Sequence, residues 1–280
     1  MNVMPKLQRG IIHLFIIAVG LIMLYPILWL ISSSFKPSYL IFTDLSLWPK
    51  EVTLDNYVNG WAGIANMSFG TFIGNSLFLA FMCVIGNIVA CSLAAFAFGR
   101  LDFSFKKILF ALMMMTIMLP YHVTIIPQYI LFRNFGWIDT YAPMFIPKLL
   151  ATDAFFIFLM VQFIRGLPRD LDESATIDGC GPFQIFFRII MPLAFPALIT
   201  TAIFTFIWTW DDFLSQLLYL NSPAQYTVPL GLRLFLDSSG ESNWGPMLAM
   251  SVISLVPSLV IFFSLQRYFV AGISTTGIKG

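Results

Sequence analysis

Charged residues are scarce in this chain: Asp, Glu, Lys and Arg make up only 10% of its 280 residues, against roughly 25% in a water-soluble domain. Apolar residues make up 59% of the chain, and 30 residues are phenylalanine. A water-soluble globular fold is therefore excluded, and the chain is expected to be solvated by lipid. The formal net charge is +1 and no basic run is interleaved with aromatic residues, so nucleic acid is not expected as a partner.

Cysteines and enzyme motifs are also scarce. The three cysteines, Cys83, Cys91 and Cys180, show neither a paired framework nor metal-ligand spacing. The sequence lacks His-Glu-x-x-His, Gly-x-Ser-x-Gly and the phosphate loop Gly-x-x-x-x-Gly-Lys-Ser/Thr. We therefore expect no catalytic residue, no metal site and no cofactor bound by this chain.

Long apolar runs are abundant, and six of them can cross a bilayer, which takes about 20 helical residues. The runs lie near residues 11–31, 75–98, 108–130, 147–164, 196–218 and 247–265. This pattern predicts an all-α membrane protein with six transmembrane helices, forming a single domain over residues 1–280. Pro120 and Pro127 fall in the third run, so a bent or broken helix is expected there.

The basic residues predict the orientation of these spans. Ten of the 15 Lys and Arg residues fall on one side of the predicted topology, in the N-terminus, 99–107, 165–195 and the C-terminus. Because Lys and Arg are enriched on the cytoplasmic side of membrane proteins, both termini and the 165–195 loop are expected in the cytoplasm.

The 165–195 loop is predicted to form a compact helix-turn-helix. Residues 171–177 can form one helix, Gly179 can end it in a left-handed conformation, and Pro182 can open the second helix. Asp178 can cap the second helix or hold the turn through side-chain hydrogen bonds. Charged residues alternate with apolar ones, which suits docking into a groove of a partner. The apolar residues are Leu171, Ala175, Phe183 and Phe187.

The same loop resembles the EAA loop of the permease subunits of ABC importers. It reads Glu173-Ser174-Ala175, then Asp178-Gly179, then Met191-Pro192, with Ser and Met where the family pattern has Ala and Leu. Other segments resemble the maltose-type carbohydrate permeases. They are Ser32-Ser33-Ser34-Phe35-Lys36-Pro37, Trp210-Asp211-Asp212-Phe213-Leu214, and the tail from Gln266-Arg267-Tyr268 to Lys279-Gly280.

This resemblance implies the type I permease fold of ABC importers, in a bacterial inner membrane, and import of a sugar or related polyhydroxylated solute by alternating access. The implied partners are a dimer of ATP-binding subunits holding ATP and Mg, a second homologous permease subunit, an extracytoplasmic solute-binding protein and membrane lipid. The tail 267–280 would reach between the ATPase subunits. The coupling loop, about 166–192, would dock the ATPase through Glu173, Ala175, Asp178, Gly179, Phe183 and Pro192.

The fifth span carries polar residues at helical spacing, which places them on one face of a helix. Polar side chains are unfavourable against lipid, so this face is expected to turn toward other helices or a translocation path. Alternatively, each threonine hydroxyl bonds to the carbonyl four residues earlier, which needs no path. The residues are Thr201, Thr205, Thr209, Asp212 and Gln216, and the last four are the candidate path residues.

A secondary transporter driven by an ion gradient is the alternative function. Such proteins usually hold ionisable residues deep in the membrane. In this chain only Asp153, Asp211 and Asp212 come near such a position. The support for this alternative is therefore thin, and the sequence does not identify the solute.

Overall fold

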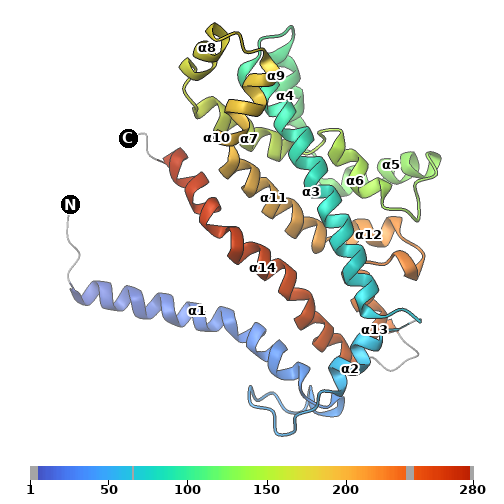
Figure 1. Cartoon of the computed structure of the whole chain (residues 1–280). Coiled ribbons are helices and arrows are strands. Elements are labelled where there is room, and N and C mark those ends of the chain that lie inside the picture. The colour runs from blue at the N-terminus through green and yellow to red at the C-terminus, as the bar shows by residue number, and fades with distance from the viewer. Residues whose placement is uncertain (1–5, 65, 238–242, 278–280) are drawn as a thin grey trace. The chain divides into compact units, whose positions relative to one another are not determined.

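The computed structural model describes residues 6–64, 66–237 and 243–277. These residues form helices joined by short connections, and their one extended pairing is an isolated bridge between Ile64 and Met67 (Figure 1). The predicted all-α architecture is confirmed. By internal contacts the chain divides into a first unit, Met1–Gly70 with Gly231–Val256, and a second unit, Thr71–Leu230 with Pro257–Gly280. Three helices continue from one unit into the other, and the predicted single domain stays a prediction.

The first unit is organised around a buried lysine that follows the first long helix. Lys36 has no solvent exposure, and its Nζ donates hydrogen bonds to the carbonyl oxygens of Asp44 at 2.7 Å and Ser46 at 2.6 Å. Asn56 Nδ2 donates to the carbonyls of Ser34 and Lys36, both at 2.8 Å. The helices of this unit are α1 (Lys6–Ser34), η1 (Ser38–Leu40) and α2 (Asp55–Ala62), with parts of α3, α13 and α14.

The second unit holds most of the remaining helices. They are α3 (Phe69–Arg100), α4 (Lys106–Ile117), α5 (Tyr121–Asn134), α6 (Ala142–Leu149), α7 (Ala154–Gly166), α8 (Asp170–Ile177), α9 (Pro182–Ile185), η2 (Phe186–Ile190), α10 (Met191–Leu193), α11 (Phe195–Trp210), α12 (Leu214–Tyr219), η3 (Pro223–Gln225), α13 (Val228–Asp237) and α14 (Trp244–Gly277). Figure 1 shows α8 and α9 at the same end of this unit as α4, away from α5 and α12.

The described residues include four helices long and apolar enough to cross a membrane, or up to six if each bent pair counts as one span. The four are Gln8–Ser34, Phe69–Arg100, Ala142–Gly166 and Trp244–Arg267. The bent pairs are Lys106–Ile117 with Tyr121–Asn134, at 102°, and Pro182–Leu193 with Phe195–Trp210, at 75°. Each predicted apolar run therefore has a counterpart among these spans. The last helix, α14, continues through the start of the predicted tail to Gly277. Residues 278–280 of the tail lie outside the described residues.

Three of the predicted spans are interrupted in the structure. The third breaks before Pro120, which lacks a backbone N–H and precedes α5, so the bend predicted there is confirmed. The fourth, predicted as one run over 147–164, is divided between α6 and α7 because Ala151 adopts a left-handed φ of 56°. The fifth, predicted to reach residue 218, ends at Trp210.

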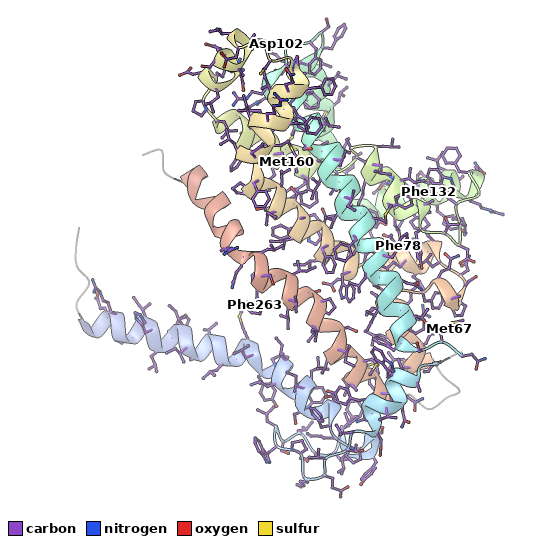
Figure 2. All side chains as sticks on the ribbon, in the orientation of Figure 1. Met67, Phe78, Asp102, Phe132, Met160 and Phe263 are labelled. Carbon is purple, nitrogen blue, oxygen red and sulfur yellow. The ribbon has the colours of Figure 1, made fainter. Side chains whose placement is uncertain are left out.

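Two apolar clusters hold the second unit together, and Figure 2 labels one residue of each, Met160 and Phe132. The Met160 cluster joins the ends of α3 and α7 to α8, α9, η2 and α11. The Phe132 cluster joins the first half of α3 to α5, α6, α12 and the start of α13. Burial of such side chains stabilises the contacts by roughly 25 cal/mol per Å² of apolar surface.

Candidate coupling element and buried polar cluster

The predicted helix-turn-helix is present over residues 170–193, here called the coupling element. Its first helix, α8, ends at Ile177, and Gly179 then takes a left-handed φ of 82°. Pro182 occupies the first turn of α9, where its missing N–H costs no hydrogen bond. Both helix boundaries and the glycine turn were predicted from the sequence, and the structure confirms them.

The cap of the second helix is held by Gln184, which the sequence reading missed. Gln184 Oε1 accepts a hydrogen bond from the backbone N–H of Gly181 at 2.9 Å. Asp178 was predicted to cap this helix or hold the turn, but its side chain makes no hydrogen bond to any described residue. The spacing of Gly181 and Gln184 matches the second half of a capping box, and this signal was available in the sequence.

Ala175, one of the predicted docking residues, faces the interior of the coupling element, and its contact with a partner stays a prediction. It is 6% exposed and belongs to the Met160 cluster with Ile185, Phe186 and Ile190. A methyl side chain at this position lets α8 approach its neighbours closely. Ala175 therefore fixes the coupling element to the bundle instead of lying on its outer surface.

The outer surface of the coupling element is apolar and exposed. The exposed fractions are 86% for Ile177, 73% for Phe183 and 64% for Phe187. The other predicted docking residues, Glu173, Asp178, Gly179 and Pro192, are also exposed. Ile177, the most exposed of the apolar residues, was missed by the sequence reading because it lies two residues beyond the 171–175 apolar pair. Exposed aromatic and aliphatic side chains of this kind typically mark an interaction surface.

An ion pair ties the coupling element to α3. Arg100 Nε lies 3.1 Å from Asp172 Oδ2, and the Arg100 side chain is 4% exposed. Arg100 also donates a hydrogen bond from Nη2 to the carbonyl of Leu167 at 3.0 Å. The last residue of a long helix is thereby attached to both the linker before α8 and α8 itself.

A polar cluster lies among α3, α6, α7 and α11, with Asn87 and Thr205 buried and Lys148 and Asp153 partly exposed. Asn87 Nδ2 donates hydrogen bonds to Asp153 Oδ2 and Thr205 Oγ1, both at 2.8 Å. Lys148 Nζ lies 2.8 Å from the same Asp153 oxygen. Asn87 and Lys148 were not predicted as site residues. A lone Asn in an apolar run, 66 and 118 residues away from Asp153 and Thr205, gives no spacing signal.

The predicted polar face of the fifth span is only partly correct. Thr201, Thr205 and Thr209 are buried on α11, but the helix ends before Asp212. Asp212 Oδ1 accepts a hydrogen bond from the backbone N–H of Ser215 at 3.0 Å, and this local bond starts α12. Gln216 therefore belongs to a separate helix.

Gln216 nevertheless returns to the end of α11. It is 1% exposed, and its Nε2 donates a hydrogen bond to the carbonyl of Thr209 at 3.0 Å. Thr227 donates from its hydroxyl to Gln216 Oε1. Thr205 bonds to Asn87 instead of its own helix, whereas Thr200 bonds to the carbonyl of Pro196, four residues earlier. Thr200 was not among the predicted threonines, so the alternative reading, a bond to the carbonyl four residues earlier, is not seen at Thr205.

Comparison with known families identifies the class of this protein. Residues 86–275 match the family described as the inner membrane component of binding-protein-dependent transport systems. The chain belongs to this family. The match covers the coupling element and the polar cluster, so both features lie within the part of the chain that defines the family.

Curated relatives match the chain along nearly its whole length. An arabinooligosaccharides transport system permease protein, AraQ, from Halalkalibacterium halodurans is 33% identical over 94% of this chain and 93% of that protein. A trehalose/maltose transport system permease protein, MalG, from Thermococcus litoralis is 30% identical over 98% of both. This family member is therefore similar to permease subunits of several sugar transport systems.

Solved structures share the fold. A bacterial ABC transporter involved in import of the acidic polysaccharide alginate matches with a TM-score of 0.84 at 20% identity, over 96% of this chain and 100% of that chain. A bacterial alginate ABC transporter in complex with an alginate pentasaccharide-bound periplasmic protein matches with a TM-score of 0.64 at 16% identity, over 93% of each chain. The permease fold of ABC importers is thereby confirmed.

Proposed function

We propose that this chain is the permease subunit of an ATP-driven, binding-protein-dependent importer of a sugar or related polyhydroxylated solute. The observation that carries the proposal is the coupling element, whose inner face is built into the Met160 cluster while Ile177, Phe183 and Phe187 stand exposed. The membership of the family and the sugar transport systems named for its relatives support the solute class.

In the proposed mechanism, a dimer of ATP-binding subunits, which holds ATP and Mg, closes on binding nucleotide and moves the coupling element. Ala175 and the ion pair of Arg100 with Asp172 pass that movement to α3, α7 and α11. The bundle then changes between inward-facing and outward-facing states. Glu173, Phe183 and the neighbouring apolar residues supply the contact with the ATPase.

The same proposal places the other partners. A second homologous permease subunit completes the path, and an extracytoplasmic solute-binding protein delivers the solute, as in the alginate transporter that was solved with its periplasmic protein. Both termini and the coupling element lie in the cytoplasm, which the distribution of Lys and Arg supports. Thr205, Thr209, Asp212 and Gln216 stay the candidate path residues.

The alternative, an ion-gradient-driven transporter, gains little from the polar cluster. Asp153, the one carboxylate within a long span of the second unit as described, is paired with Lys148 at 2.8 Å and bonded to Asn87. A carboxylate held by a cation and an amide is already satisfied. An ATP-driven mechanism needs no free ionisable group in the membrane.

Gentle purification of the tagged chain from its native membrane tests the proposal. Wild type and the variant Glu173→Ala/Gly179→Val are compared for the proteins that co-purify. The matched control is Glu51→Ala/Gly136→Val, since Glu51 is exposed and Gly136 has a similar left-handed φ of 70°. We expect an ATP-binding protein with wild type and control, and its loss from the coupling variant. A chain that purifies alone in all three forms, well folded, contradicts the proposal.

A further inference from the structure

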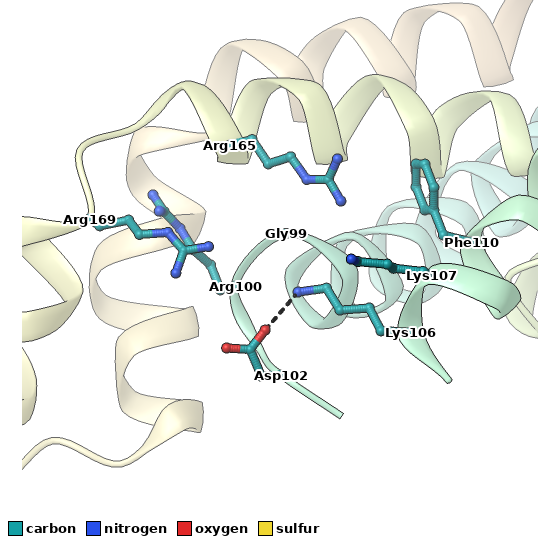
Figure 3. A pocket seen from close by; sticks show the side chains of 8 residues that line it. All are labelled: Gly99, Arg100, Asp102, Lys106, Lys107, Phe110, Arg165 and Arg169. Atoms are coloured by element: carbon teal, nitrogen blue, oxygen red, sulfur yellow. Dashed lines mark hydrogen bonds and ion pairs between the residues drawn. The ribbon is translucent and has the colours of Figure 1, made fainter. Parts of the chain in front are cut away.

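A strongly basic pocket lies beside the coupling element in the second unit. It has a volume of about 580 Å³ and is lined by Gly99, Arg100, Asp102, Lys106, Lys107, Phe110, Arg165 and Arg169 (Figure 3). Five of these residues are cations and one is an acid. The residues come from the end of α3, the start of α4, the end of α7 and the linker before α8.

Part of this positive charge is already used within the protein. Arg100 pairs with Asp172, and Lys106 Nζ lies 3.3 Å from Asp102 Oδ1. Arg165 donates from Nη2 to the carbonyl of Phe98 at 3.2 Å and its guanidinium carbon lies 5.1 Å from the ring centroid of Phe110.

Two cations of the pocket have no such partner. Lys107 and Arg169 make neither a hydrogen bond nor an ion pair with any described residue. Both are exposed and line the same hollow. The first turn of α4 carries no acidic residue and no side-chain cap, so its free backbone N–H groups add to the attraction for an anion.

The position of the pocket indicates where an anion would come from. Arg100 ends the span Phe69–Arg100, Arg165 lies next to the end of the span Ala142–Gly166, and Lys106 begins the bent pair. Ends of membrane spans lie at the level of the lipid headgroups. Beyond the pocket, α4 exposes Ile108, Leu109 and Leu112, at 58%, 46% and 53%, which is a surface for acyl chains.

We propose that this pocket binds a phosphate group, carried by the headgroup of an anionic phospholipid. Arginine and lysine are the side chains that recognise phosphate, arginine through paired N–H donors and lysine as a point charge. Basic pockets between transmembrane helices are suited to phospholipid headgroups. Because Arg169 directly precedes α8, the bound lipid steadies the linker from which the coupling element projects.

Native mass spectrometry of the full chain, with whatever subunits co-purify, tests this site. The probes are phosphatidylglycerol and phosphatidylcholine, with inorganic pyrophosphate as a soluble phosphate. The variants are Lys107→Gln and Arg169→Gln, singly and together, because neither residue supports the fold through a hydrogen bond. Arg188→Gln is the control, since Arg188 is an exposed cation of the coupling element outside the pocket.

We expect wild type to retain phosphatidylglycerol over phosphatidylcholine and each single substitution to weaken retention about 5-fold, with the control unchanged. Binding of pyrophosphate with no preference for phosphatidylglycerol supports the phosphate site and assigns it to a soluble source. Equal retention of both lipids without pyrophosphate binding overturns the proposal, as does an equal loss in the control. Loss of a co-purifying protein from the double variant, with lipid retention unchanged, assigns the cations to a protein contact and also overturns it.

Discussion

Lys36 shows how one residue can hold a whole connection. A fully buried ammonium is unfavourable unless it is hydrogen bonded, and Lys36 meets two carbonyl oxygens that no other described donor satisfies, those of Asp44 and Ser46. The Ser32–Pro37 segment was singled out by its resemblance to carbohydrate permeases, and its lysine has a structural role here.

Substituting Lys36 by methionine should destabilise the first unit by about 3 kcal/mol, because the buried carbonyl of Asp44 and the part-buried carbonyl of Ser46 lose a charged donor. Thermal unfolding of the purified chain measures the effect. Lys50→Met changes an exposed lysine of the same connection. Its free energy of unfolding should stay within about 0.5 kcal/mol of wild type. Equal effects of the two substitutions would contradict the assignment.

Asp139 makes the folding stability of the protein depend on pH in the acidic range. Hydrogen bonds from Ser222 and from the backbone N–H of Asn221 lower the pKa of Asp139 below its ordinary value of 3.8. Because the folded-state pKa is lowered, the bonds contribute stability fully above the ordinary pKa. That contribution is lost as the pH falls through the lowered pKa.

The unfolding midpoint should therefore fall as the pH is lowered past 3.8 and through the lowered pKa of Asp139, and Asp139→Asn should flatten part of that fall. Asp178→Asn serves as the control, since its carboxylate has no hydrogen bond to a described residue. Identical pH profiles for Asp139→Asn and wild type would refute the role of Asp139.

At the scale of the residue, the sequence predicted the residues that end and begin helices, but it did not predict hydrogen bonds between residues far apart in the chain. Gly179 and Pro182 follow local rules of helix ends, and both stand where those rules place them. The partners of Asn87 come from segments 66 and 118 residues away. No local pattern encodes such a pairing, so it becomes visible only in the folded chain.

At the scale of the element, the turn between α8 and α9 links nucleotide use to solute movement in the proposed mechanism. Gly179→Val should keep the complex assembled but uncouple ATP hydrolysis from uptake. A β-branched residue at φ 82° carries a strain of about 1–2 kcal/mol, although open space surrounds the glycine. The strain changes the direction in which α9 leaves the turn, while the contact between the coupling element and the ATPase is kept.

Uptake and ATP hydrolysis by reconstituted complexes measure this uncoupling. Gly136→Val is the matched control, because Gly136 has a φ of 70° and equally open surroundings, and it lies outside the coupling element. We expect full coupling in the control. Undiminished uptake per ATP in Gly179→Val would count against the coupling element as the link.

The polar cluster allows a second test at this scale. Lys148→Met and Asp153→Asn should each lower stability by about 2 kcal/mol, because each leaves a charge without its partner; the pair is 22% and 28% exposed, which moderates the cost. The double variant should cost less than the sum, as a double-mutant cycle of unfolding midpoints would show.

Uptake by the same double variant tells whether the polar cluster only packs the helices or also lines the translocation path. If the cluster only packs the helices, uptake should return together with stability. If it lines the path, uptake should stay low in a stable protein. A cycle that is strictly additive would show that Lys148 and Asp153 do not interact as the 2.8 Å distance indicates.

The apolar runs predicted the existence of each span well and its boundaries less well. Hydropathy measures how readily a segment enters lipid, but it does not record where the helix breaks. The fifth run stays apolar to residue 218, yet the helix ends at Trp210 because Asp212 bonds locally to the start of α12. The burial of Ala175 was likewise not predicted, because apolar spacing does not tell an inward face from an outward one.

At the scale of the whole molecule, the proposed function makes a prediction about energy supply. Complexes reconstituted in liposomes with their ATPase and solute-binding protein should take up solute only with ATP and Mg inside the compartment that holds the ATPase. A protonophore should leave the rate unchanged within about 2-fold, since no gradient drives transport. Uptake that stops with the protonophore while ATP remains would favour the secondary transporter.

The hydrogen bonds of Asn87 hold helices of the second unit together at one point. One amide nitrogen lies 2.8 Å from both Asp153 and Thr205, near the middle of α3, with α8 and α9 at one end of the unit and α12 at the other (Figure 1). Asp153 directly precedes α7 and Thr205 lies within α11, so Asn87 joins the middle of α3 to both of these helices. In the proposed mechanism we expect a push on α8 to move α12 in the opposite direction, so that opening at one end of the unit and closing at the other become a single motion.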